Sequence, residues 1–177
     1  AFGQQLLDGG AHLKPVFEQT LLPLISKRLL DPSLQRSNSG SIGLGSALSL
    51  FLAAHRKAPK LMAEVGTYIG NSAAALGCGA GMAQQAVQLI TCDLHPCTQQ
   101  PFAGLTLPEG SKAQVVQGTS TKMFEFLASK QARLDMLHLD GRLMKDDLKL
   151  LSQLLKKDTL IALDDCEGDE KGHMNLD

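Results

Sequence analysis

The sequence predicts an α/β fold, with a doubly wound, mostly parallel sheet and helices on both faces. Two observations support this prediction. From Lys60 onward, short apolar runs of strand character alternate with segments whose apolar residues have helical spacing, and this alternation is typical of βαβ units. The apolar runs also end at glycine or aspartate residues. Because ligands bind beyond the carboxyl ends of parallel strands, we expect a site at that edge.

The segment before Lys60 is expected to be helical. Residues 12–31 fit one or two helices, and residues 31–45 are rich in Ser and Gly, as loops are. Apolar residues then recur at helical spacing, at Leu44, Ala47, Leu48, Phe51 and Leu52. We therefore divide the chain into an N-terminal helical segment, residues 1–37, and an α/β domain, residues 38–177.

Five strands are expected in the α/β domain, over residues 61–65, 86–93, 113–118, 134–140 and 159–165. One connecting helix is expected near residues 71–83. A second holds Met123, Phe126 and Leu127, and a third has Leu148, Leu151 and Leu155 on one face. Asp146 and Asp147 on that third helix are expected to face solvent.

Composition excludes several classes of protein. The formal net charge is −1 and aromatic residues make up 4% of the 177 residues, so neither a basic stripe nor a base-stacking platform for nucleic acid is expected. The apolar stretches are too short to span a bilayer, and no secretory signal is evident. Four cysteines without zinc spacing are typical of reduced thiols, which favours a cytoplasmic protein.

The predicted strands end at residues suited to a ligand, namely Gly66, Asp93, Gly118, Asp140 and the pair Asp164 and Asp165. Any one aspartate could instead cap the following helix. Together they would line one rim of the sheet. A P-loop and a dinucleotide fingerprint are both absent from the turn "AEVGTYIGNSAAA" at residues 63–75, where the glycine spacing is Gly66-x-x-x-Gly70.

The chemistry of this rim favours a ligand that carries hydroxyls and positive charge. No Lys or Arg occurs between Lys60 and Lys112, whereas Glu64, Asp93 and Glu109 do. A ribose diol donates to a carboxylate, and an ammonium or sulfonium is attracted to one. S-adenosylmethionine has a ribose diol, an ammonium and a sulfonium, and it has no phosphate.

Five segments together resemble class I S-adenosylmethionine-dependent methyltransferases. They are "EVGTYIGNS", "LITCDLHP", "VVQGTSTKMF", "DMLHLDG" and "LIALDD", and they extend over about residues 38–172. The chain is most similar to the metal-dependent O-methyltransferase branch, which includes catechol, caffeoyl-CoA and sugar O-methyltransferases. The resemblance implies a Rossmann-like methyltransferase fold, S-adenosylmethionine as cofactor and metal-assisted O-methylation of a small hydroxylated molecule.

The resemblance also implies the cofactor-binding residues. The methionine end would meet Glu64, Gly66, Thr67, Tyr68, Gly70 and Ser72. Asp93 would bind the ribose hydroxyls, and the adenine would lie near Leu94, His95, Gly118, Thr119 and Ser120. Ser41 and Ile42 resemble the entrance loop that closes over the cofactor.

A divalent cation and a catalytic residue are implied as well. Asp140, Asp164 and Asp165 match the metal ligands of the family, and their hard oxygen atoms suit Mg²⁺. The doubled aspartate could equally cap a helix. Asp140 is the candidate catalytic residue and could itself act as the base. Leu143 stands where catechol-type members have a lysine, and Arg142 and Lys145 nearby are expected to lie at the surface, so the base is left unassigned. His138 is expected to be a hydrogen-bonded core residue.

The chain departs from the family at its end. The family fold continues to two further strands, whereas this sequence stops at Asp177, so a sheet lacking the last strands is expected. Two other readings stay open: a metal-independent N- or O-methyltransferase, and a non-catalytic member that only binds the cofactor. The helices of residues 1–35 need a surface to pack on, which leaves a homodimer open. The sequence does not identify the methyl acceptor.

Overall fold

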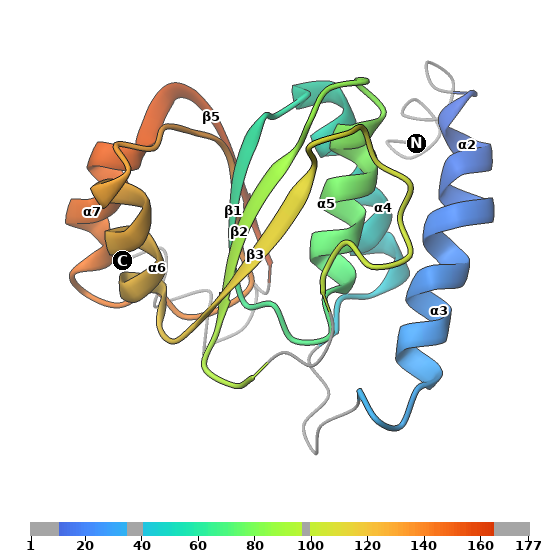
Figure 1. Cartoon of the computed structure of the whole chain (residues 1–177), viewed down its shortest axis with the longest axis horizontal. Helices are drawn as coiled ribbons and strands as arrows, with labels where there is room; N and C mark the ends of the chain where they lie inside the picture. Colours follow the sequence, from blue (N-terminus) through green and yellow to red (C-terminus); the bar gives the residue numbers. More distant parts are fainter. Residues whose placement is uncertain (1–10, 35–40, 97–99, 165–177) are drawn as a thin grey trace.

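The computed structural model describes residues 11–34, 41–96 and 100–164, which contain one five-stranded sheet (Figure 1). All neighbouring strands pair in parallel, in the order β3-β2-β1-β4-β5. The strands are β1 (Leu61–Val65), β2 (Gln88–Asp93), β3 (Lys112–Gln117), β4 (Leu134–Leu139) and β5 (Leu155–Leu163). The predicted α/β fold with a parallel sheet is confirmed.

Helices cover both faces of the sheet. On one face lie α4 (Leu44–Lys57) and α5 (Asn71–Gly81), and on the other α6 (Ser120–Ser129) and α7 (Asp147–Leu154) (Figure 1). The N-terminal helices run along the outer side of α4 and α5 (Figure 1). They are α2 (Leu13–Val16), the π-helical turn η1 (Phe17–Leu21) and α3 (Leu22–Leu30). None of the helices in the described part of the chain has the length and apolar character of a bilayer crossing.

Alternation along the strands builds an apolar core on each face. Met62 pairs with Leu89 and Met136 in register, and all three pack in the cluster that includes α4 and α5. The next position, Ala63, is paired with Ile90 and Leu137, and these residues pack with α6 and α7. Because successive side chains point to opposite faces of the sheet, a shift of one residue in the strand register would exchange the residues of the two cores.

Small residues in α5 allow its backbone to approach α4 closely. A Cβ atom added at Gly79 would lie 2.1 Å from the Phe51 carbonyl oxygen of α4. One added at Gly77 would lie 2.3 Å from the Phe102 ring. The second half of α5 is therefore packed tightly against α4 and the Phe102 ring.

The last helix and strand differ from the prediction. Leu155 already has extended backbone and begins β5, so it does not share a helical face with Leu151. Leu151 and Leu154 are the buried leucines of α7, whereas Leu148 is 66% exposed. The solvent-facing prediction holds for Asp146 and is wrong for Asp147, which is fully buried. The inward face of α7 begins at Asp147 because that residue lies against the start of α6.

Candidate functional site

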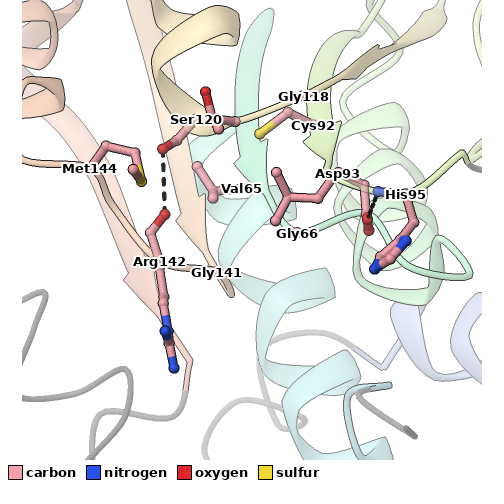
Figure 2. Close-up of a pocket in the computed structure, with 12 residues that line it drawn as sticks. Val65, Gly66, Cys92, Asp93, His95, Gly118, Ser120, Gly141, Arg142 and Met144 are labelled. Atoms are coloured by element: carbon pink, nitrogen blue, oxygen red, sulfur yellow. Dashed lines mark hydrogen bonds between the residues drawn. The ribbon is translucent and has the colours of Figure 1, made fainter. Parts of the chain in front are cut away.

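The carboxyl ends of the central strands meet at a cavity of about 280 Å³ (Figure 2). Figure 2 shows Asp93 and His95 on one side of this cavity and Ser120, Arg142 and Met144 on the opposite side. Segments following β1, β2, β3 and β4 contribute its lining, which is Val65, Gly66, Cys92, Asp93, Leu94, His95, Gly118, Thr119, Ser120, Gly141, Arg142 and Met144. The cavity therefore lies where the strand-end rule places a ligand.

Gly66 forms the base of the cavity where β1 ends. Its φ of 98° lies in the region that favours glycine, and an added Cβ atom would lie 2.8 Å from the Asp140 carbonyl oxygen. The Gly66 amide donates to the Cys92 carbonyl oxygen at 2.9 Å. A side chain at this position would push apart the ends of β1 and β4, so the turn requires glycine.

Asp93 presents an oriented carboxylate at the rim of the cavity. Its Oδ2 accepts a hydrogen bond from the Tyr68 amide at 2.7 Å, and its Oδ1 accepts one from the His95 amide at 2.9 Å. The second bond is drawn in Figure 2. These amides fix the plane of the carboxylate, and a carboxylate oxygen can accept more than one hydrogen bond. Two parallel acceptors in a fixed plane suit a vicinal diol.

The opposite wall is tied together by Asp147. Its carboxylate accepts hydrogen bonds from the Ser120 hydroxyl, from the Thr121 hydroxyl at 2.6 Å and from the Met144 amide at 2.7 Å. Ser120 also lies 3.4 Å from the Arg142 carbonyl oxygen, the contact drawn in Figure 2. Asp147 thus fastens the loop after β4 to the first turn of α6. Sequence reasoning missed this residue; the hydroxyl pair at positions 120 and 121 was the available signal.

A buried polar network lies beneath the glycine turn. Glu64 is 0% exposed, accepts a hydrogen bond from Thr91 Oγ1 at 2.8 Å and lies 3.1 Å from His138 Nδ1. Thr67 Oγ1 lies 2.7 Å from Thr91 Oγ1 and extends the network toward the turn. Burial lowers the pKa of His138, but the hydrogen bond and charge of Glu64, with Asp140 and Asp164 nearby, raise that pKa above its usual value.

These contacts bear on two of the predictions. His138 is a buried, hydrogen-bonded core residue, as predicted. Glu64 belongs to the network and is not among the residues that line the cavity. Direct contact between Glu64 and a cofactor therefore stays a prediction.

A second, smaller pocket lies at the start of α5. Gly70, with φ of 78°, precedes that helix. Three of the six residues predicted for the methionine end line this pocket beside the predicted entrance loop. The lining is Ser41, Ile42, Thr67, Tyr68, Ile69, Asn71, Ser72 and Asp140. Sequence reasoning missed Asn71, whose Nδ2 donates to Ser41 Oγ at 2.8 Å. Its Oδ1 is buried and has no hydrogen-bond partner among the described residues.

The structure describes two of the three predicted metal ligands. Asp140 lines the small pocket, and Asp164 lines a groove between α4 and β5. The two follow neighbouring strands, since the Asp164 amide donates to the Leu139 carbonyl oxygen at 2.9 Å. Asp165 lies outside the described residues. Within the described ranges, no group of three His, Cys, Asp or Glu side chains is arranged to hold a metal ion. The metal site therefore stays a prediction.

Comparisons with known proteins bear on this geometry. A family model described as "Methyltransferase domain" matches residues 63–166, a range that includes both pockets apart from Ser41 and Ile42. A search of curated protein sequences finds no match.

Solved structures of low sequence identity share the fold. An O-methyltransferase from Bacillus cereus, in complex with S-adenosylhomocysteine (SAH), has a TM-score of 0.62 at 14% identity, over 84% of this chain and 66% of that one. The SAH-bound methyltransferase PaMTH1 from Podospora anserina has a TM-score of 0.57 at 20% identity, over 85% of this chain and 62% of that one. The O-methyltransferase TomG from Streptomyces achromogenes, bound to S-adenosylmethionine and involved in tomaymycin synthesis, has a TM-score of 0.52 at 17% identity, over 72% and 58%. The matched part of this chain thus spans less than two thirds of each of these three proteins.

Proposed function

This chain belongs to the methyltransferase-domain family, as its five motifs predicted, and we propose that it transfers a methyl group from S-adenosylmethionine to an oxygen of a small hydroxylated molecule. The observation that carries the proposal is the Asp93 carboxylate, held by two backbone amides at the rim of an otherwise largely apolar cavity. The O-methyltransferases of similar fold, two of them solved with SAH or S-adenosylmethionine, support the reaction class.

In this proposal the nucleoside occupies the larger cavity. The ribose hydroxyls donate to Asp93, because this carboxylate lines the cavity and two backbone amides fix its orientation. The adenine ring lies against Val65, Cys92 and Met144, which supply apolar surface. Leu94, His95, Gly118, Thr119 and Ser120 border this position, as the resemblance implied.

The methionine end then lies over the small pocket at the start of α5, which has a volume of about 10 Å³ in this structure. Asn71 Oδ1 is a buried acceptor without a partner among the described residues, and an ammonium group supplies the missing donor. Asp140 lines the same pocket and adds negative charge. The carboxylate of the ligand is favoured at the N-terminus of α5, where backbone amides and the helix dipole attract anions.

Methyl transfer needs alignment more than any other contribution from the protein. The acceptor oxygen forms the new bond to the methyl carbon as the bond from that carbon to sulfur breaks, and SAH leaves. Asp140 accepts the proton of the acceptor hydroxyl. Holding oxygen, carbon and sulfur in line contributes up to roughly 7–11 kcal/mol in favourable cases, and Gly66 with Asp93 provides the fixed side of that alignment.

We also propose a divalent cation beside Asp140 and Asp164. Both side chains carry hard oxygen ligands and follow neighbouring strands, which fits Mg²⁺ in kind. A bound cation lowers the pKa of a coordinated hydroxyl and so makes it a better nucleophile. The small hydroxylated acceptor, a homodimer and a cytoplasmic location are further predictions.

The test is turnover. The protein is incubated with S-adenosylmethionine and a panel of small hydroxylated acceptors, and SAH formation is measured with and without a chelator. We expect acceptor-dependent SAH that falls with chelator and with Asp140→Asn. Turnover that resists the chelator supports a metal-independent enzyme. SAH binding without turnover of any acceptor supports the non-catalytic alternative and contradicts the enzymatic proposal.

A further inference from the structure

The N-terminal helix α3 carries an arginine that is almost completely buried. Arg28 is 1% exposed, and its guanidinium donates to three backbone carbonyl oxygens. Nη1 donates to Gly70 at 2.6 Å, and Nη2 donates to Pro101 at 2.8 Å and to Ala103 at 3.0 Å. One side chain thus joins α3, the turn before α5 and the loop at residues 100–104, segments that are distant in sequence.

We propose that Arg28 is a positioning residue for the cofactor site, which holds the Gly70 turn in the conformation that binds the methionine end of the cofactor. This inference rests on the proposed function. The N-terminal helical segment is then a working part of the cofactor site, although sequence analysis separated residues 1–37 from residues 38–177.

Gly70 is the residue on which the small pocket depends. Its amide donates to the Thr67 carbonyl oxygen at 2.8 Å, and its carbonyl oxygen accepts the first α5 hydrogen bond from Ala74 at 2.9 Å. The pocket residues Tyr68, Ile69, Asn71 and Ser72 flank it on both sides. Fixing the Gly70 carbonyl therefore fixes the direction in which α5 starts and the positions of its neighbours.

Arg28 also packs directly behind this turn. A Cβ atom added at Gly70 would lie 3.3 Å from Arg28 Nη1 and 3.3 Å from Pro101 Cα. The arginine and the loop thus both lie close to the position that a side chain at Gly70 would take. Loss of the guanidinium leaves space in which the turn can move away from the pocket.

The charge of Arg28 has a second effect on the site. Burial lowers the pKa of Arg28 to about 10, so the guanidinium remains protonated at neutral pH. A cation beside the start of α5 adds to the positive charge at that end of the helix dipole. This arrangement by itself disfavours folding and attracts an anion. Leu21 and Ile25, both 0% exposed, already anchor these helices in the core. In our proposal, this charge also attracts the carboxylate of the ligand at the α5 N-terminus.

The test compares three variants with the wild-type protein. Arg28→Met keeps most of the side-chain volume and removes both donors and charge. Arg28→Lys keeps the charge and loses the planar fork that reaches separate carbonyls. Ile25→Ala is the matched control, because it shortens a fully buried apolar side chain of the same helix and leaves the hydrogen bond from Arg28 to Gly70 in place. The readouts are the SAH dissociation constant by calorimetry, the melting temperature and the rate of backbone hydrogen exchange over residues 66–74 without ligand.

We expect Arg28→Met to weaken SAH binding by about tenfold or more, which corresponds to the loss of one hydrogen bond from a charged group. The same variant should accelerate backbone hydrogen exchange over residues 66–74. Arg28→Lys restores part of the affinity. Ile25→Ala lowers the melting temperature and leaves both the affinity and the exchange at the turn unchanged. If Arg28→Met does not fold, the affinity and exchange of Arg28→Lys decide.

Two results would overturn the inference: wild-type affinity and exchange in the folded Arg28 variants, or equal changes in Ile25→Ala. The proposed function fails separately, when the wild-type protein does not bind SAH. The exchange comparison then still shows whether Arg28 holds the Gly70 turn.

Discussion

Asp147 offers the sharpest test of how the cavity wall is built. It is fully buried, and its carboxylate accepts hydrogen bonds from two hydroxyls of α6 and from the Met144 amide. Asp147→Ala removes all three acceptor contacts. The Thr121 hydroxyl is half-buried and can turn to water, whereas Ser120 is 3% exposed and keeps only its longer contact of 3.4 Å to the Arg142 carbonyl oxygen.

The magnitude follows from these contacts. A hydrogen bond to a charged group contributes about 1.5–3 kcal/mol, and a buried donor left unpaired costs a similar amount, so Asp147→Ala should lower the free energy of unfolding by about 3 kcal/mol. In a chain of this size that is a fall of roughly 6–12 °C in melting temperature.

Asp147→Asn should cost much less, about 1 kcal/mol, because a neutral amide oxygen still accepts from Ser120 and Met144. The Thr121 hydroxyl can rotate and accept from the new NH₂ group.

Urea unfolding followed by circular dichroism measures these differences, provided that the transition is two-state. Asp146→Ala is the control, since the neighbouring aspartate is exposed and should change stability by less than about 0.5 kcal/mol. If Asp147→Ala is as stable as the wild-type protein, or if Asn costs as much as Ala, the three hydrogen bonds do not hold the wall in the way described.

Two other substitutions test the glycine turn after β1 and the amino end of β4. Gly66→Ala should lower the free energy of unfolding by about 2 kcal/mol, because φ is 98° and the new Cβ would lie 2.8 Å from the Asp140 carbonyl oxygen. Thermal unfolding should show the loss of stability and SAH titration a loss of affinity. Unchanged binding would mean that the turn adapts. Asp135 accepts hydrogen bonds from the amides of Lys60 and Leu61 and from the Lys156 ammonium. Burial alone would raise the pKa of Asp135, but these partners outweigh it, so the pKa lies below its usual value. Stability from a lowered carboxyl pKa is present above the unfolded value of about 3.9 and is lost as pH falls through the folded value. Asp135→Asn should therefore be less stable than the wild-type protein near neutral pH and equally stable once Asp135 is protonated in both states, whereas a difference that persists unchanged to the lowest pH would contradict this explanation.

The fold was predictable because its signals are local. Strands β1 to β4 begin and end within two residues of the expected positions, since each apolar run is bounded by a glycine, an aspartate or a polar segment. Strand β5 begins four residues early because Leu155 follows Leu154 without a turn, and no residue there marks the change from helix to strand. The rule that ligands meet strand ends placed Asp93 at the cavity without any long-range information.

The contacts that complete the site were not predictable from local patterns. Arg28 lies 42 residues before Gly70 and 73 before Pro101, and on the sequence it resembles any basic residue near the end of a helix. Asp146 and Asp147 are indistinguishable until α6 packs against one of them. Glu64 was assigned through the family resemblance, and the structure shows that this side chain bonds within the sheet to Thr91 and lies beside His138.

The central claim is that the cavity binds S-adenosylmethionine through Asp93. Calorimetric titration with SAH of the wild-type protein, of Asp93→Ala and of the exposed acidic control Glu109→Ala tests it most directly. We expect the wild-type protein and Glu109→Ala to bind equally well. Asp93→Ala should lose about 3 kcal/mol, roughly a hundredfold in affinity, because two hydrogen bonds to a charged acceptor are removed. Equal binding by Asp93→Ala, or no binding by the wild-type protein, would contradict the claim.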